Sequence, residues 1–160
     1  MTRRVALVCL GNICRSPMAD VVLEHQLAEA GVDDVEVSSS GTGDWHVGQP
    51  MDERAAATLT AAGYDATRHR ARTFTADWFD EQDLILVMDA SNHADVLALA
   101  TSDEQRAKVR MYRSFDPEAD SPDAEVPDPW YGGPEGFDDV LAMVERTTTE
   151  IVRHLTNSPD

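Results

Sequence analysis

A short apolar segment that leads directly into a glycine turn and a helix start constrains the fold more than any other feature of this sequence. Residues 4–9 are apolar after the first position, as in strands that are buried on both faces of a parallel sheet. Gly11 and Asn12 interrupt the segment. Ser16 and Pro17 then open a helix, with serine as its cap and proline in its first turn. A strand that turns at once into a helix favours an α/β fold.

The rest of the chain keeps this alternation of strand and helix patterns. Strand patterns cover 4–9, 35–37 (closed by Ser40 and Gly41), 84–88 and 109–112, and helical patterns cover 16–30, 52–62, 92–100 and the stretch after Gly136. Strands that alternate with helices predict a parallel sheet with helices on both faces. No repeat and no break in composition marks a domain boundary, so we expect residues 1–160 to form a single domain.

The composition narrows the choice of partners and compartment. The chain of 160 residues carries 13 basic and 30 acidic side chains, a formal net charge of -17. Phosphate backbones and anionic membranes require a basic face, so we expect no nucleic acid and no membrane as a partner. The apolar segment 5–10 is too short for a membrane span or a signal peptide. Two cysteines form no disulfide framework, which is typical of a reduced, cytoplasmic protein.

The turn between the first strand and the first helix contains the residues with the clearest chemical potential. Backbone N–H groups and the dipole at a helix N-terminus bind anions, and Cys9 ends the strand beneath them. These donors, together with Arg15, favour the thiolate form of Cys9. The planar guanidinium of Arg15 matches two oxygens of a phosphate. Ser16 can donate a hydrogen bond to the sulfur, and Gly11 permits a close approach of the backbone.

Residues of this turn also have ordinary structural explanations. Cys9 can be a buried apolar residue at a strand end, with Arg15 exposed to solvent, because unpaired cysteine is often buried. Cys14 can be a small packing residue of the turn. From the residues alone, both explanations stay open.

The same holds for candidates elsewhere in the chain. Asp128 ends the segment 116–128, whose six carboxylates and three prolines are typical of a surface loop. Trp45 can belong to the core, since tryptophan is usually well buried. His69 lies between two arginines and can be an exposed histidine. Asp89 follows an apolar strand, at the sheet edge where open α/β folds bind ligands.

The string from Val8 to Pro17 resembles the active-site loop of the low-molecular-weight protein tyrosine phosphatases. The string Asp128-Pro129-Trp130-Tyr131-Gly132 resembles the general-acid loop of that family, and weaker matches span nearly the whole chain. The weaker matches are 40–42, 45–46, 50–54, 69–72 and 79–89. The resemblance implies a single-domain, three-layer α/β/α fold with a four-stranded parallel sheet and a Cys-x5-Arg phosphate-binding loop.

The resemblance also assigns roles to individual residues. It implies that Cys9, Arg15 and Asp128 are catalytic, as nucleophile, phosphate-binding cation and general acid. It favours a redox role for Cys14, through a protective disulfide with oxidised Cys9. The residues implied to bind substrate are Leu10, Gly11, Asn12, Ile13, Cys14, Ser16, Trp45, Trp130 and Tyr131. The residues implied to support the loop are Asn12, Ser40, His69 and Asp89, the last by pairing with Arg15 or Arg54.

These assignments predict a phosphatase that hydrolyses phosphotyrosine, and small aryl phosphates, through a cysteinyl-phosphate intermediate. Its partners are then phosphotyrosine-containing proteins of signalling, with inorganic phosphate as product and inhibitor. Arginine and backbone dipoles supply the positive field, so we expect no metal and no cofactor.

Four alternatives remain at this point. A thioredoxin-coupled arsenate reductase needs three cysteines, and this chain has two. Protein arginine phosphatases resemble this loop with threonine at the position of Ile13. The phosphatases associated with capsule and exopolysaccharide kinases are aliphatic at the position of Trp45. A catalytically silent phosphate-binding module would share the loop, but the intact Cys9, Arg15 and Asp128 argue against it.

Overall fold

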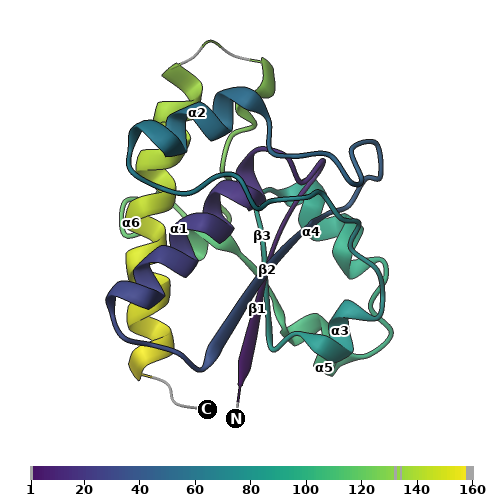
Figure 1. Ribbon diagram of the computed structural model, residues 1–160. Helices are drawn as coiled ribbons and strands as arrows, with labels where there is room; N and C mark the ends of the chain where they lie inside the picture. Colours follow the sequence, from purple (N-terminus) through teal and green to yellow (C-terminus); the bar gives the residue numbers. More distant parts are fainter. Residues whose placement is uncertain (1, 132, 134, 158–160) are drawn as a thin grey trace.

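Four parallel strands form one sheet, in the order β2-β1-β3-β4 (Figure 1). The computed structural model describes residues 2–131, 133 and 135–157, the side chain of Tyr131 excepted. The strands are β1 (Arg3–Cys9), β2 (Val35–Gly41), β3 (Leu84–Val87) and β4 (Val109–Met111). The chain adds β2 on one side of β1, and β3 and β4 on the other, so the strand order reverses between β1 and β3. Open α/β sheets bind ligands at the carboxyl ends of the strands at such a point.

Helices cover both faces of the sheet (Figure 1). The helices of one face are α1 (Arg15–Glu29), α2 (Glu53–Ala61) and α6 (Glu135–Asn157). The helices of the other face are α3 (Trp78–Glu81), α4 (Ala90–Leu97) and α5 (Asp103–Ala107). Two short 3-10 helices also occur, η1 (Tyr112–Phe115) and η2 (Pro129–Tyr131). The expected three-layer architecture with a four-stranded parallel sheet is confirmed.

The central strand β1 contributes to both hydrophobic layers. Val5 and Leu7 share a cluster with apolar side chains of α1 and α6, whereas Ala6 and Val8 pack in the cluster that includes residues of α3 and α4. All four side chains are completely buried. The last residue of the strand, Cys9, is therefore placed by a backbone that is packed on both faces and hydrogen bonded on both edges.

Most expected elements are present with small shifts of their ends, but two differences have a physical reason. The expectation that Ser16 caps the first helix is wrong, because α1 begins at Arg15 with Cys14 as N-cap and no side chain caps it. The Ser16 hydroxyl lies against the Cys9 sulfur instead. The helices α3 and α5 were not expected, since four or five residues are too few to show a helical period.

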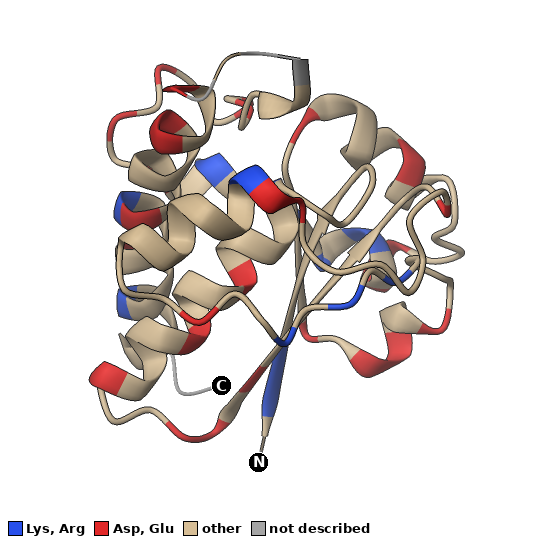
Figure 2. Cartoon of the chain, turned by 45° about the horizontal axis from the view of Figure 1, so that its top comes forward, with Lys and Arg blue, Asp and Glu red and all other residues tan. Residues whose placement is uncertain are grey.

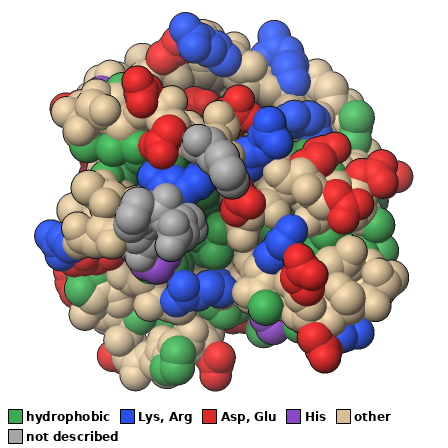
Figure 3. All heavy atoms as spheres, turned by 90° about the horizontal axis from the view of Figure 1, so that it is seen from below, with side chains coloured by type: hydrophobic (Ala, Val, Ile, Leu, Met, Phe, Trp, Pro, Cys, Tyr) green, Lys and Arg blue, Asp and Glu red, His purple; other side chains and the backbone are tan. Residues whose placement is uncertain are grey.

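Acidic residues are distributed over the helices and loops, as the red parts of the chain in Figure 2 show. On the face at the amino ends of the strands, basic and acidic side chains are intermixed (Figure 3). One ion pair at this end joins Arg4 of β1 to Glu36 of β2, with 2.9 Å between nitrogen and oxygen. Within the part of the chain that the structure describes, no helix has the length and apolar character needed to cross a membrane.

Candidate active site

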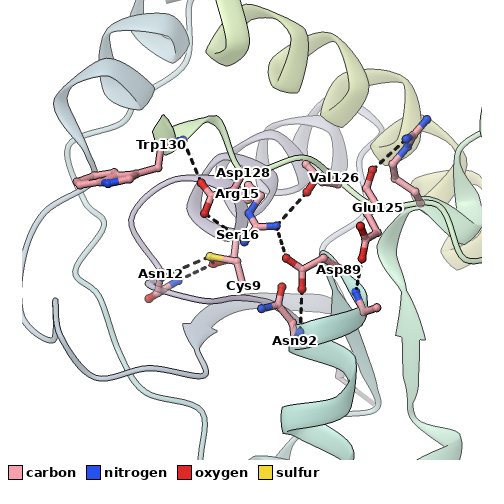
Figure 4. Close-up of polar contacts among 12 residues, drawn as sticks. Cys9, Asn12, Arg15, Ser16, Asp89, Asn92, Glu125, Val126, Asp128 and Trp130 are labelled. Atoms are coloured by element: carbon pink, nitrogen blue, oxygen red, sulfur yellow. Dashed lines mark hydrogen bonds and ion pairs between the residues drawn. The ribbon is translucent and has the colours of Figure 1, made fainter. Parts of the chain in front are cut away.

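The sulfur of Cys9 lies at the carboxyl end of β1, where the strand order reverses. The residue is 3% exposed. The backbone N–H of Asn12 donates a hydrogen bond to the sulfur, with 3.3 Å between nitrogen and sulfur, and the Ser16 hydroxyl lies 3.0 Å from it. Figure 4 shows both contacts. These two contacts fix the position of the sulfur at the base of the turn. We call residues 9–15 the phosphate loop.

Asn12 shapes the phosphate loop from inside the protein. Its φ of 58° lies in the left-handed region, which asparagine tolerates better than most residues, and its side chain is completely buried. The amide nitrogen of the side chain donates to the hydroxyls of Ser16 (2.8 Å) and Ser39 (3.0 Å). The amide oxygen accepts from the backbone N–H of Arg72 at 2.9 Å. A side chain with all these partners satisfied makes the loop rigid.

His69 and Gly41 fix the same turn from two further directions. The Nε2–H of His69 donates to the backbone carbonyl of Asn12. Burial lowers the pKa of His69, and the nearby charges of Arg72 and Arg70 lower it further, so the ring is neutral at neutral pH. A Cβ atom added at Gly41 would lie 2.6 Å from the Leu10 carbonyl oxygen, so only glycine allows this approach of backbone to backbone.

Arg15 is a buried cation at the start of α1. Its side chain is 3% exposed, and its Nη1 donates to Asp89 at 2.7 Å and to the carbonyl of Val126 at 2.9 Å (Figure 4). Burial opposes the charge of Arg15, but the neighbouring Cys9, Asp89 and Asp128 outweigh this effect and raise its pKa. The expected pairing of Asp89 is therefore with Arg15. The guanidinium of Arg54 instead contacts Asp52.

Asp128 approaches Arg15 from the segment that precedes α6. One carboxylate oxygen accepts from the backbone N–H of Trp130 at 3.0 Å, within its own turn. The other oxygen lies 3.8 Å from Nη2 of Arg15, and the carboxylate side chain is 31% exposed. One end of this side chain is thus fixed by η2, while the other faces the phosphate loop (Figure 4).

A cavity of about 260 Å³ opens above the phosphate loop. It is lined by Cys9, Leu10, Gly11, Ile13, Cys14, Arg15, Trp45, His46, Asp128 and Trp130. This volume is below the roughly 300–1,000 Å³ that drug-sized ligands occupy, and it suits one phosphorylated ring. A larger cavity of about 560 Å³ lies between α1 and residues 64–72, and none of the three expected catalytic residues lines it.

The two tryptophans at this cavity are surface residues. Trp45 is 66% exposed and Trp130 is 41% exposed, so the core role that Trp45 also allowed is excluded. The Trp45 ring lies over Gly43, where an added Cβ would come within 1.9 Å of it. The Arg54 guanidinium stacks 5.1 Å from the centre of the Trp130 ring and donates to the Trp130 carbonyl at 3.3 Å. These contacts orient flat apolar walls beside the buried Arg15.

Cys14 lines the same cavity, but its chemistry differs from that of Cys9. Both cysteines are free thiols in the structure. Burial raises the pKa of Cys14 well above its ordinary value, and the charges of Asp52, Cys9 and Asp128 raise it further. Cys14 is therefore a protonated thiol at neutral pH, which is a poor nucleophile.

The structure places most of the expected site residues around one cavity. Some of them line the cavity, and others lie beneath the phosphate loop. Asn12 and Ser16 were expected to bind substrate, and their side chains lie beneath the loop, where they contact each other. Ser40 contributes its carbonyl, which accepts from Ser16 at 3.4 Å. The side chain of Tyr131, also expected to bind substrate, lies outside the described residues, as does Gly132 of the same motif.

Three residues at the site were missed by the sequence reasoning. They are Ser39, His46 and Arg54, which contact Asn12, the cavity and Trp130 respectively. His46 could have been predicted to line the cavity, because it directly follows Trp45, which was expected to bind substrate. Arg54 ends the matched string 50–54 and was expected only as a possible partner of Asp89, so its contact with Trp130 was missed. Ser39 carried no signal, because its partner Asn12 is distant in the sequence.

Known proteins resemble the chain over nearly its whole length. A family model described as low molecular weight phosphotyrosine protein phosphatase matches residues 4–159. The chain belongs to this family. A low molecular weight protein-tyrosine-phosphatase of Streptomyces coelicolor is 44% identical over 153 residues, which cover 95% of this chain and 93% of that protein. Low molecular weight protein-tyrosine phosphatase A of Mycobacterium tuberculosis is 45% identical over 142 residues, with 88% and 84% covered.

Solved structures agree with this family membership. The crystal structure of a protein tyrosine phosphatase from Entamoeba histolytica, with Hepes in the active site, superposes with a TM-score of 0.92 at 28% identity, covering 99% of this chain and 100% of that one. The crystal structure of Primo-1 gives a TM-score of 0.88 at 34% identity, covering 99% and 100%. As a member of the low molecular weight phosphatases, the protein is a protein-tyrosine phosphatase, a hydrolase that acts through a cysteinyl-phosphate intermediate.

Proposed function

We propose that Cys9, Arg15 and Asp128 carry out phosphotyrosine hydrolysis as nucleophile, phosphate-binding cation and general acid. The observation that carries this assignment is their convergence on one cavity from two separate segments, the phosphate loop and the segment that precedes α6. Residues 1–160 act as one catalytic domain in this proposal, in line with the match over 4–159. The described groups that face the phosphate loop need no metal or cofactor for the two steps below.

The first step transfers the phosphoryl group to the enzyme. The Cys9 thiolate attacks phosphorus, and a P–S bond forms as the P–O bond to the tyrosyl oxygen breaks. The electron pair of that P–O bond stays on the tyrosyl oxygen, which takes the proton of Asp128. Loss of the proton leaves Asp128 as a carboxylate, 3.8 Å from the guanidinium of Arg15 in the structure.

The second step returns the enzyme to its starting state. A water molecule attacks phosphorus and gives its proton to the Asp128 carboxylate, while the P–S bond breaks and Cys9 leaves as the thiolate. Arg15 and the loop N–H groups bind the three equatorial oxygens in both steps. Inorganic phosphate is the product and fits the same groups, so it acts as an inhibitor.

The substrates in this proposal are phosphotyrosine-containing proteins of a cytoplasmic signalling system. The flat rings of Trp45 and Trp130 in the cavity lining support an aromatic substrate group. Ile13 is an apolar part of the lining, which supports phosphotyrosine over phosphoarginine. The free thiols of Cys9 and Cys14 support a reducing compartment.

Side-by-side assays with phosphotyrosine, phosphoserine and phosphoarginine peptides test the substrate class. We expect turnover of the phosphotyrosine peptide and of p-nitrophenyl phosphate, with competitive inhibition by inorganic phosphate. Preferred hydrolysis of the phosphoarginine peptide would contradict the assignment of the Ile13 lining. The absence of any turnover would indicate a silent binding module.

Cys14 protects the nucleophile from irreversible oxidation in this proposal. Peroxide converts the Cys9 thiolate to a sulfenic acid, and the Cys14 thiol condenses with it, releasing water and forming a disulfide. Their common place in one cavity lining supports this reaction. We expect Cys14→Ala to be active in reductant but to lose activity permanently under peroxide. If Cys14→Ala recovers with dithiothreitol as fully as the wild type, Cys14 is only a packing residue.

A further inference from the structure

The segment that carries the proposed general acid has no regular secondary structure of its own. Residues 116–128 form turns and extended chain between η1 and η2, and we call them the acid segment. Asp128 nevertheless faces Arg15 at 3.8 Å. Its position must come from contacts between the acid segment and the rest of the protein, because a free loop of this length samples many conformations.

The first end of the acid segment is anchored by a buried carboxylate. The Asp116 side chain has no exposed surface, and both of its oxygens accept hydrogen bonds from arginines. Nε of Arg113 donates at 2.8 Å, and Arg146 of α6 donates through two nitrogens at 2.9 and 3.1 Å. The backbone N–H of Glu118 adds a fourth donor at 2.9 Å. Burial opposes the charge, but these hydrogen bonds outweigh it and lower the pKa of Asp116.

The second end of the acid segment is fixed next to the phosphate loop. The Val126 N–H donates to the carbonyl of Met88 at 2.8 Å, and the Val126 carbonyl accepts from Arg15 at 2.9 Å. The Glu125 carboxylate accepts from the backbone N–H of Ala90 at 2.7 Å. Figure 4 shows Glu125 and Val126 beside Asp89 and Arg15. Pro127 then separates Val126 from Asp128, and its fixed φ limits how Asp128 can move.

Arg113 joins these two ends. Its Nε contacts Asp116, and its Nη1 donates to the backbone carbonyl of Glu125 at 3.0 Å. Among the residues that the structure describes, it is the side chain that hydrogen bonds to both ends of the acid segment. It is only 15% exposed, and both contacts are charge-assisted, which makes them stronger than ordinary surface hydrogen bonds. Arg113 does not line the substrate cavity.

We propose that Arg113 is a positioning residue for proton transfer by Asp128. By tying Asp116 to Glu125, it closes the acid segment into a loop of fixed shape and presents Asp128 to the leaving oxygen. The inference rests on the proposed role of Asp128 as general acid. In a positioning role, the loss of Arg113 weakens proton donation by Asp128 and leaves phosphate binding intact. In a purely structural role, its loss would weaken both.

The test compares Arg113→Met with the matched control Arg106→Met. Arg106 also pairs with an aspartate three residues away, Asp103, but on the exposed surface of α5. kcat/KM is measured for a series of aryl phosphates, because it reports on formation of the phosphoenzyme, where the leaving group departs. For Arg113→Met we expect kcat/KM to fall about 10-fold with leaving groups of pKa near 10. This fall is smaller than the 10²–10⁴-fold rate contribution that is typical of a general acid. The loss should vanish for acidic leaving groups, and the Ki of inorganic phosphate should be unchanged.

A double variant separates positioning from general loss of structure. In an Asp128→Asn background, Arg113→Met should cost nothing further, because the proton donor is already absent. Arg113→Lys, which reaches one end of the acid segment at a time, gives an intermediate loss and provides a folded variant if Arg113→Met is unstable. Equal loss across all leaving groups, or an additional loss in the Asp128→Asn background, overturns the inference. If the loss of kcat/KM in Asp128→Asn does not depend on the leaving group, Asp128 is not the general acid, and the inference about Arg113 is then wrong as well.

Discussion

The phosphate loop and the acid segment meet at one cavity, but they are held in place by different kinds of contact. At the phosphate loop, Cys9 and Asn12 contact each other and the adjoining Ser16 within eight consecutive residues, and the loop continues a central strand into a helix. In the acid segment, the contacts come from the arginine side chains of Arg113, of Arg146 in α6 and of Arg15, which is far away in the sequence. The nucleophile is therefore positioned mainly by local chain geometry, and the acid mainly by side-chain contacts from outside its own segment.

Because of this difference, we expect that a substitution can disturb the geometry of one region without disturbing that of the other. A loop fixed by a packed strand, a helix start and the buried amide of Asn12 should keep its anion-binding geometry when remote surface residues change. A segment fixed by a few side-chain contacts should lose its shape when any one of them is removed. Phosphate binding and proton transfer should therefore respond to different substitutions.

The largest effect is expected inside the phosphate loop. Cys9→Ser should reduce kcat below about a hundredth of the wild-type value, because a serine hydroxyl at this site is a far weaker nucleophile than a thiolate. Phosphate and vanadate should still bind, since Arg15 and the loop backbone are unchanged. Steady-state kinetics with p-nitrophenyl phosphate and a binding titration measure the two effects. A variant that retains more activity than this would refute covalent catalysis by Cys9.

Arg15→Lys should be nearly as harmful as Arg15→Ala. A lysine ammonium cannot contact two phosphate oxygens with the planar geometry of a guanidinium, least of all while it also replaces the Nη1 contacts to Asp89 and Val126. We expect kcat to fall and KM to rise, because Arg15 contacts phosphate in the ground state and in the transition state. A lysine variant with near-normal kinetics would exclude the bidentate role.

The phosphate loop could be predicted from the sequence because the residues that form it are nearly contiguous. Cys9, Gly11, Asn12, Arg15 and Ser16 were visible together, and a strand before them and a helix after them gave the chemistry its context. The four-stranded parallel sheet followed from the same alternation of patterns, strengthened by the family resemblance.

The contacts that hold the acid segment were not predictable in this way. Arg113 and Arg146 contact Asp116 from 3 and 30 residues away, and an arginine on a surface helix gives no sign of its partner. Ser39 was missed for a related reason: it reaches Asn12 only because β2 pairs with β1 in this register. Local patterns predict elements and turns, whereas these pairings depend on tertiary packing.

A third variant probes the long-range support that the phosphate loop does have. Asp20 of α1 lies against Ser39, and burial raises its pKa to about 7, with the nearby Glu24 raising it and the Ser39 hydroxyl and Arg72 opposing the shift. A folded-state pKa above the unfolded one means that the folded protein binds the proton more tightly. Stability should therefore fall as pH rises from about 4 to about 7.

Asp20→Asn removes this pH dependence, because an amide does not ionise. We expect the variant to be more stable than wild type at pH 8, by on the order of 1 to 4 kcal/mol, and to differ less at pH 5. Urea unfolding at both pH values measures the free energy, with the exposed Asp103→Asn as control. A variant that is less stable at pH 8 would show that the Asp20 carboxylate is needed by its neighbours.

The smallest effect is expected at the wall of the cavity. Gly43→Ala should displace the Trp45 ring, since the new Cβ would lie within 1.9 Å of it. We expect KM for aryl phosphates to rise about 3- to 10-fold with little change in kcat, in line with loss of one aromatic contact of about 0.5–1.5 kcal/mol. The Ki of inorganic phosphate serves as internal control, and a parallel rise in that Ki would show that the phosphate loop itself has moved.

The separation of phosphate binding from proton transfer is tested most directly by one set of linear free-energy plots. The logarithm of kcat/KM is measured against leaving-group pKa for the wild type, Arg15→Lys and Asp128→Asn. We predict a parallel downward shift for Arg15→Lys, because every substrate carries the same phosphate. For Asp128→Asn we predict a steeper line, with a loss of about 10²- to 10⁴-fold at the basic end that disappears for acidic phenols. A line for Asp128→Asn that runs parallel to the wild-type line would contradict the assignment of proton transfer to Asp128. A line for Arg15→Lys that becomes steeper toward basic leaving groups would contradict the assignment of Arg15 to phosphate binding alone.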